Sequence, residues 1–529
     1  MVRKKRVIAA VSALALAGLG LAACGGGGSG DAKPGELRYP IGEPKSLIPP
    51  NTTESEGSTV EDFVYAGLYD YNKDGTLKPI IAKSEPTTKD NIHFTIKLNS
   101  GWKFQNGEDI TAQTFVDTIN YGAYGPNANT GTSFYTKIAG YDDLQGKKPK
   151  SKKMSGLKAK DDTTLEITLS KQFVGYPQLL GYTAYLPMAQ ACIKDVDACN
   201  TKPIGNGPFK MDGKWDHKKQ IDLKRWSGWK GEEPNIKSVH FKILTGETTS
   251  YPDFQAGKLD LATPNSDQYE EAKDKYGSDM IEEKTSATWG LGFPVYDKVF
   301  KDPKVRKAFS MAIDREAYNK GVFQGRKEVA DSWTPPPIPG YKQGTCGDLC
   351  TFDKKEAQKL LDESSYPKGK KVTLWTEPSP QAKKYTKVIG DQLKENLGLS
   401  YELKALEWPD LLEKKQKHAL TGPFMTGWLP DYPLNEDYLY PLYGVQPNDF
   451  GYNNKAFNDA VDQGNTANSI EDAEKKYQKA EEMLAADPPV APIYIDKTST
   501  LLGDRVVHDS YERNPVLGGF DIFKLKLKD

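Results

Sequence analysis

The chain has 529 residues, with 71 Lys and Arg against 72 Asp and Glu, and a formal net charge of −1. Balanced charge argues against nucleic acid as a partner, because nucleic-acid-binding domains carry a concentrated basic patch. A hydrophobic fraction of 37% supports large cores, and a chain of this length predicts two or three domains.

The first 23 residues predict a lipoprotein signal peptide. Cations at 3–6 precede an apolar run at 7–19, which is too short to span a bilayer. Leu21-Ala22-Ala23-Cys24 follows and resembles the bacterial lipobox. The resemblance implies cleavage before Cys24, a diacylglycerol on its sulfur, and a protein on the outer face of the cell membrane. Residues 24–35 would form a flexible Gly/Ser-rich tether. An ordinary signal cleaved elsewhere is the alternative.

The first folded elements are predicted from periodicity. Apolar residues at helical spacing favour a helix over Val60–Tyr69. Strict alternation from Ile92 to Leu98 favours a half-buried strand. Asn106-Gly107 is typical of a turn, and Thr111 is expected to cap the helix that follows it.

Four cysteines remain after Cys24, and outside the cytoplasm they are expected to form disulfides. The short spacings favour the pairs Cys192–Cys199 and Cys346–Cys350, although four cysteines allow three pairings. A zinc site is the rival interpretation, but no histidine lies near them in the sequence. We expect no metal and no cofactor.

The second half of the chain alternates predicted helices with predicted strands, which favours α/β layers. Asp302 is a suitable N-cap before Pro303 in a helix with one apolar stripe. Further helices are predicted at Ala382–Leu397 and Ile470–Ala486, with strands at 372–376 and 401–406 between them.

The stretch Thr421–Tyr443 concentrates aromatic rings, carboxylates and prolines. Four prolines forbid a long helix, so a shaped loop is expected. Rings beside a carboxylate suit a ligand that carries an ammonium group. Packing against the core, with Asp431 capping a turn, is an equally good interpretation of these residue types. The residues concerned are Trp428, Tyr432, Tyr438, Tyr440, Tyr443, Asp431, Glu436 and Asp437.

Several blocks together resemble family 5 of the bacterial extracellular solute-binding proteins, the oligopeptide- and dipeptide-binding lipoproteins of ABC importers. The first is the sequence from Gly101 to Val116, a strand-to-helix segment that contains Asn106-Gly107-Glu108. The others, in family order, are 203–210 (PIGNGPFK), 225–241, 254–260 (FQAGKLD) and 302–315 (DPKVRKAFSMAIDR).

The resemblance implies an α/β, periplasmic-binding-protein-like fold of two lobes with an extra domain in the N-terminal half. The lobes would close on the ligand, and the closed form would dock on an ABC permease. The protein would not be an enzyme and would be a monomer. The expected domains are 36–67 with 200–287 and 503–529 (lobe I), 68–199 (the extra domain) and 288–502 (lobe II).

The resemblance also assigns the candidate site. The family's G-W-x-A-D-Y loop matches Gly427-Trp428-Leu429-Pro430-Asp431-Tyr432, with proline in place of alanine. It implies that Asp431 pairs with a peptide's α-ammonium group. Relatives can carry an arginine three residues before the tryptophan for the peptide carboxylate, but here that position is Met425.

Weaker candidates come from the N-terminal half. Glu54, Glu56 and Gly57 lie where relatives supply backbone contacts, and Phe134 and Tyr135 are expected to contribute from the extra domain. Ordinary solvated or packed residues are an equally good interpretation of each.

The sequence gives little support to an enzymatic function. No G-x-S-x-G elbow and no H-E-x-x-H motif supports a hydrolase. A solute-binding protein for an oligosaccharide, a nickel complex or haem remains the alternative, because aromatic rings suit sugars as well as peptides.

Overall fold

The computed structural model describes residues 32–245 and 250–528. Predictions about the leader and Cys24 therefore lie outside the described residues. The names lobe I, extra domain and lobe II are used below for the ranges predicted above, whose boundaries stay a prediction.

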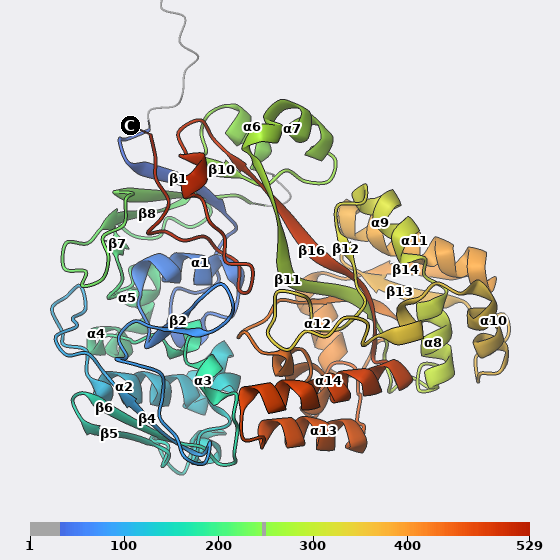
Figure 1. Ribbon diagram of the computed structural model, residues 1–529, viewed down its shortest axis with the longest axis horizontal. Coiled ribbons are helices and arrows are strands. Elements are labelled where there is room, and N and C mark those ends of the chain that lie inside the picture. The colour runs from blue at the N-terminus through green and yellow to red at the C-terminus, as the bar shows by residue number, and fades with distance from the viewer. Residues whose placement is uncertain (1–31, 246–249, 529) are drawn as a thin grey trace, which may run out of the picture.

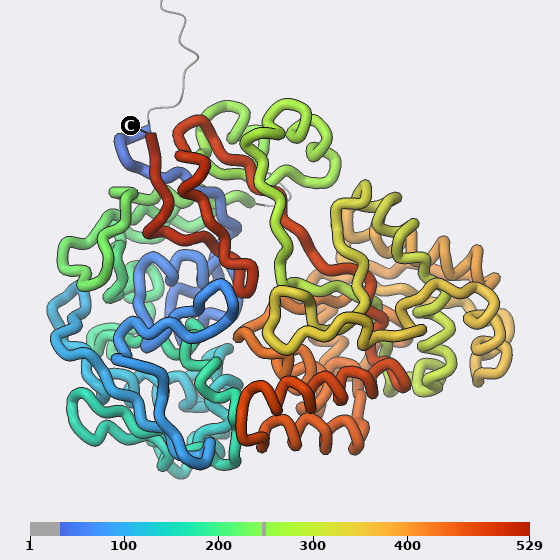
Figure 2. Tube along the Cα trace, viewed as in Figure 1, coloured from blue at the N-terminus to red at the C-terminus, as the bar shows by residue number. Residues whose placement is uncertain are grey.

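Lobe I is built on a four-stranded sheet of order β1-β9-β8-β7, in which β1 and β9 are parallel and the other pairs antiparallel. Buried residues from three distant parts of the chain form its core, among them Leu37, Phe241 and Leu525. Figures 1 and 2 show the C-terminal segment returning beside β1. Its elements are β1 (Glu36–Ile41), α1 (Ser55–Val64), β7 (Phe209–Met211), β8 (Gln220–Arg225), β9 (Ser238–Ile243), α6 (Tyr251–Gln255), β10 (Leu261–Ala262) and α7 (Tyr269–Tyr276).

A buried ion cluster ties these segments together. Asp260, the last residue of the FQAGKLD block, accepts hydrogen bonds from the guanidinium groups of Arg38 in β1 and Arg505 beyond the last strand. Its carboxylate is 1% exposed, so both cations compensate for its desolvation.

The helix expected over Val60–Tyr69 is displaced, and this prediction was wrong at both ends. Helix α1 begins at Ser55 and ends at Val64. Its end is set by the PIGNGPFK block, because the Gly207 amide donates to the Val64 carbonyl and the Asn206 side chain bonds both backbone groups of Ala66. The apolar pattern continues past Val64, but the backbone groups are taken by that block.

The extra domain packs α2 against a three-stranded antiparallel sheet of order β4-β6-β5. The strand predicted at 92–98 is confirmed as β4, and Thr111 caps α2 through a capping box. The predicted pair Cys192–Cys199 is disulfide-bonded. Its elements are β2 (Tyr69–Tyr71), β3 (Leu77–Pro79), β4 (His93–Lys97), α2 (Ala112–Ala123), β5 (Leu157–Asp161), β6 (Thr164–Thr168), α3 (Tyr176–Leu179), α4 (Gln190–Lys194) and α5 (Val196–Thr201).

Lobe II contains helices around a mixed sheet of order β10-β16-β11-β15-β13-β14, with β12 paired to β16. The predicted helix after Asp302 and the strands and helices predicted at 372–376, 382–397, 401–406 and 470–486 are all present. Its elements are β11 (Met280–Gly292), α8 (Pro303–Met311), α9 (Arg315–Phe323), β12 (Glu328–Val329), α10 (Lys354–Asp362), β13 (Val372–Thr376), α11 (Pro380–Leu397), β14 (Tyr401–Ala405), α12 (Trp408–Gln416), β15 (Phe424–Trp428), α13 (Lys455–Asn465), α14 (Ile470–Ala486) and β16 (Val490–Leu502).

Two long strands run between the lobes. β11 and β16 have 13 residues each and pair antiparallel, with register shifts near Lys284–Thr288 and at Trp289–Gly290. One end of β16 pairs with β10, and the other end of β11 pairs with β15. Figure 1 shows this ribbon crossing the centre of the molecule. Irregular pairing within a two-stranded connection suits a hinge.

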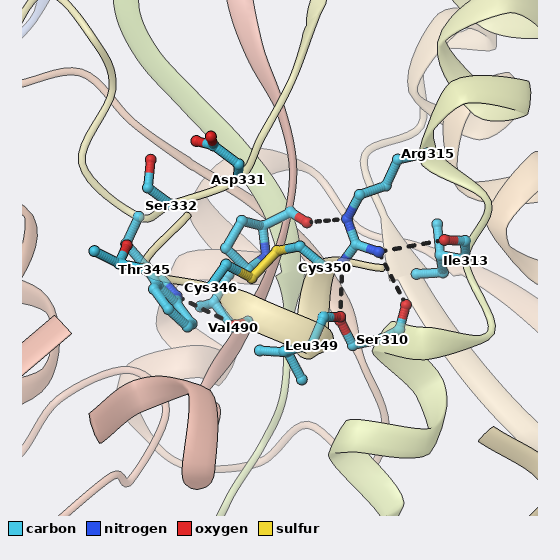
Figure 3. Close-up of a disulfide and its surroundings, with 12 residues drawn as sticks. Ser310, Ile313, Arg315, Asp331, Ser332, Thr345, Cys346, Leu349, Cys350 and Val490 are labelled. Carbon is cyan, nitrogen blue, oxygen red and sulfur yellow. Dashed lines mark hydrogen bonds between the residues drawn. A yellow bond between two sulfur atoms is a disulfide. The ribbon is translucent and has the colours of Figure 1, made fainter. Parts of the chain in front are cut away.

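The second predicted disulfide, Cys346–Cys350, is also formed. Ser310 donates to the carbonyl of Leu349 beside it at 2.7 Å, and Arg315 donates to Ser310 and to the Pro492 carbonyl of β16 (Figure 3). Burial lowers the pKa of Arg315 to about 9, and no carboxylate of the described residues pairs with it. The disulfide therefore closes a short turn within an irregular connection, and the Ser310 hydrogen bond holds that turn against α8.

Candidate functional site

The loop expected at Thr421–Tyr443 opens with a strand, because β15 occupies Phe424–Trp428. β15 pairs with β11 along its whole length, but β13 reaches it at a single pair, Trp375 with Phe424. From Met425 to Trp428, one edge of the strand thus carries no ladder partner among the described residues. Such an edge can pair with an extended ligand.

Asp437 organises the turn that follows β15. Its Oδ2 accepts hydrogen bonds from the Trp428 indole at 3.0 Å and from the backbone amide of Asp431 at 2.9 Å. Its Oδ1 is buried without a partner in the described chain. Burial raises the pKa of Asp437 well above its usual range, and the nearby Asp431 raises it further. Burial and the neighbouring Asp431 thus both favour the protonated form of Asp437.

The Asp431 side chain is half-buried at the junction of lobe II and the extra domain. Burial raises its pKa to about 7, and a hydrogen bond with the Tyr182 side chain of the extra domain opposes the shift. No ion pair neutralises Asp431 among the described residues. At pH 7 this carboxyl group lies close to half ionisation and has no cation beside it.

A second contact joins the extra domain to lobe II. The Lys137 ammonium lies 3.6 Å from Glu436 Oε1, and it sits over the rings of Phe173 at 4.0 Å and Tyr440 at 4.6 Å. The Glu436 side chain is fully buried, and its other oxygen accepts from the Tyr432 hydroxyl. The extra domain and lobe II are thus in direct contact in this structure.

The three predicted neighbours of Asp431 take different positions. Tyr432 is buried, with its hydroxyl bound to Glu436. The Trp428 indole is bound to Asp437 and packs on the cluster of Ile338, Tyr438 and Val516. Gly427 is exposed, and a Cβ there would lie 2.8 Å from the Trp289 indole. Tyr432 and Trp428 therefore hold the turn, while Gly427 leaves room for a ring.

The predicted residues of lobe I lie at the start of α1. Glu54 caps the helix: its two carboxylate oxygens accept from the Gly57 amide at 3.0 and 2.9 Å. A Cβ at Gly57 would collide with the Ser46 carbonyl. Partial burial and the neighbouring Glu54 raise the pKa of Glu56. Glu54 and Gly57 thus have structural roles at the start of α1, and a ligand contact of any of the three residues stays a prediction.

Phe134 and Tyr135 of the extra domain separate in the structure. The Phe134 ring packs on Tyr182, the partner of Asp431, with ring centroids 4.2 Å apart. Tyr135 is fully buried and its hydroxyl donates to the Ala184 carbonyl. The structure brings Phe134 toward Asp431 through Tyr182, whereas Tyr135 belongs to the core of its domain.

Sequence reasoning missed three residues of this junction. Asp437 stood in the aromatic stretch but was given no role, and its neighbours in sequence carried no signal that it would bind both Trp428 and Asp431. Lys137 and Tyr182 lie about 300 and 250 residues away in the printed chain, so only the fold brings them to the loop.

Two cavities border β15. A small one of about 30 Å³ lies beside Trp428 and Trp333. A larger one of about 710 Å³ opens on the other side of Gly427, between β15, β16, α9, α11 and α12. Thr426, Gly427 and Trp289 line both cavities. A volume of this size is typical of a small-molecule or peptide site.

Residues 76–450 match the family model "Bacterial extracellular solute-binding proteins, family 5 Middle". The chain belongs to this family. The family resemblance found in the motifs is confirmed, and the family is one of binding proteins rather than enzymes. In the described part of the chain, no cluster of side chains could hold a metal ion, and no helix has the length and apolarity to cross a membrane.

Relatives match over most of their length. The chain is 27% identical to the oligopeptide-binding protein OppA of Bacillus subtilis, covering 90% of this chain and 91% of that protein. It is 26% identical to the dipeptide-binding protein DppE of the same organism, over 88% and 87%. It is 26% identical to the glutathione-binding protein GsiB of Escherichia coli, over 85% and 87%.

Solved structures confirm the two-lobed α/β fold. The Escherichia coli murein tripeptide binding protein MppA aligns with a TM-score of 0.79 at 21% identity, covering 93% of this chain and 99% of that one. Haemophilus influenzae OppA, in complex with the peptide RPPGFSPFR, aligns with a TM-score of 0.78 at 23% identity, over the same shares.

Proposed function

We propose that this protein is a lipid-anchored extracytoplasmic binding protein that encloses oligopeptides between its lobes and delivers them to an ABC permease. Relatives named for oligopeptides, dipeptides and glutathione support a peptide ligand. So does the open edge of β15, which offers backbone groups to any extended peptide without reading its side chains.

The observation that carries the proposal is the position of Asp431. It is half-buried where the extra domain meets lobe II, and a neutral phenol is its side-chain partner. A peptide ammonium would supply the missing cation and would form a charge-assisted hydrogen bond, which is stronger than one from a hydroxyl. Tyr182 would then give up Asp431 to the ligand. We therefore assign to Asp431 the role of binding the α-ammonium group of the peptide.

Two contacts across the junction support closure of the protein on its ligand. Lys137 with Glu436 and Tyr182 with Asp431 join the extra domain to lobe II. A ligand that bridges the same surfaces binds the closed state better than the open one and shifts the population toward it. The closed shape would be the one that the permease recognises.

Native mass spectrometry of the purified protein tests the ligand class. We expect retained masses of tripeptides to pentapeptides, which acid treatment releases and amino-acid analysis identifies. A hexose ladder would contradict the proposal and favour an oligosaccharide-binding protein instead.

The lipid anchor has its own test. Cys24→Ala removes the proposed site of diacylglycerol attachment, so the variant is expected to leave the membrane fraction. Cys346→Ser serves as the matched loss of a cysteine elsewhere in the chain, and it should stay membrane-bound. Retention of the Cys24→Ala protein after detergent-free washing would show that Cys24 is not the anchor.

A further inference from the structure

The larger cavity beside β15 is lined by two tryptophan side chains that are exposed to solvent. Trp289 is 36% exposed and Trp408 is 44% exposed, and both face this cavity. They are two of the five large apolar side chains exposed in the described chain. Leaving apolar surface in water is unfavourable, so two indoles facing one hollow indicate a surface that is covered when the protein works.

The remaining walls are aromatic as well. Trp289 stacks on Tyr494 with ring centroids 6.2 Å apart, and Phe323 packs on Tyr385 at 4.8 Å and on Tyr494 at 4.7 Å. Trp289 is paired across the strands with Gly427, which has no side chain to displace the indole. The aromatic side chains of the walls are thus held in place by contacts with one another. They form a preorganised surface on which a further aromatic ring can pack.

Aromatic walls attract cations as well as aromatic rings. The charged residues that line the cavity therefore decide which kind of side chain it favours. Lys327 is paired with Asp496. Arg326 forms no ion pair in the described chain, and its Nη2 is buried without a hydrogen-bond partner. Lys497 likewise has no carboxylate partner there. Of the two carboxylates that line the cavity, Asp496 is taken by Lys327, and Glu377 is exposed to solvent. The cavity therefore disfavours a Lys or Arg side chain.

We propose that this cavity receives a large aromatic side chain of the bound peptide and sets the side-chain preference of the protein. The inference rests on the proposed function. Gly427, at the cavity's wall, lies four residues before Asp431, a span of at most ~14 Å along an extended chain. A peptide whose ammonium is held by Asp431 then reaches the cavity by its fifth residue at the latest. We assign the cavity to the third or fourth residue.

Calorimetry on pentapeptides tests the inference. Each position of an all-alanine pentapeptide is replaced in turn by Phe, Trp or Arg. We expect Phe and Trp to tighten binding by about tenfold or more at the third or fourth position, as burial of an aromatic side chain would. Arg at that position should give no such gain, and Phe elsewhere should change affinity little.

Trp408→Ala is the matching variant, because Trp408 is half-exposed at the start of α12 and its loss leaves the core intact. The gain from Phe should shrink several-fold in this variant. Phe352→Ala, at a residue that is 41% exposed and not part of the cavity lining, is the control and should keep the full gain. A blue shift of tryptophan fluorescence with the Phe peptide, but not with the alanine peptide, would support the same conclusion.

The outcomes separate the two proposals. If no pentapeptide binds, the proposed function fails. If peptides bind and N-acetylation weakens them, but the affinity is flat across side chains, the function stands and this inference is wrong. An equal gain from Arg and Phe, or an undiminished Phe gain in Trp408→Ala, would also overturn it.

Discussion

At the scale of single residues, Asp431 connects ionisation to function. Its pKa is raised to about 7 by burial, and burial together with Asp431 raises the pKa of the neighbouring Asp437 well above its usual range. Asp431 is half-buried and Asp437 is buried, and two such neighbouring carboxyl groups cannot both ionise at low cost. We expect one to keep a proton and the other to remain available to a cation. The site can thus hold one ammonium group without a fixed counter-cation of its own.

This assignment predicts a pH dependence of binding. Only ionised Asp431 pairs with an ammonium group, so protons compete with the ligand below pH 7. The dissociation constant of a peptide should rise by about tenfold for each pH unit between about pH 6.5 and 5. Asp431→Asn should show a flat profile over the same range. An equally steep profile in that variant would place the titrating group elsewhere.

At the scale of elements, local sequence predicted much of lobe II because its signals agree with the fold. α8 begins after Asp302, which caps it, and α14 occupies Ile470–Ala486 as periodicity predicted. α1 was misplaced because its N-cap is a glutamate and because Asn206 and Gly207, distant in sequence, end it. Tyr182 and Lys137 could not be assigned to the site for the same reason: the contacts that define it are long-range.

Glu54 gives a prediction that separates capping from ligand contact. Glu54→Ala removes both acceptors from the Gly57 amide, and loss of an N-cap typically costs about 1 kcal/mol. Chemical denaturation should show that loss in the free energy of unfolding. Glu56→Ala is the control, because Glu56 lies in the first turn of α1 but does not cap the helix. It should change the free energy of unfolding very little. A drop in peptide affinity with unchanged stability would show that Glu54 contacts the ligand after all.

At the scale of the whole molecule, Lys137 and Glu436 link the extra domain to lobe II. Lys137→Met leaves a fully buried carboxylate without its cation, a change that costs about 3–5 kcal/mol in buried pairs. Because the cost falls on the closed arrangement alone, ligand-free protein should open. Small-angle X-ray scattering should then report a larger radius of gyration, and peptides should bind more weakly.

Lys171→Met is the control for this experiment, since Lys171 lies in the same domain, is exposed and has no ion pair in the described chain. It should leave both the radius of gyration and the affinity unchanged. If Lys137→Met behaves as this control does, the contact with Glu436 does not stabilise closure.

The central claim is that Asp431 holds the peptide's α-ammonium group, and a double-mutant cycle by calorimetry tests it most directly. Asp431→Asn should weaken binding by about 2–5 kcal/mol, because it removes one partner of a buried charge pair. N-acetylation of the peptide should cost wild type a similar amount, and cost Asp431→Asn much less, because both changes remove one interaction. If the two losses simply add, Asp431 does not contact the ammonium group and the account is wrong.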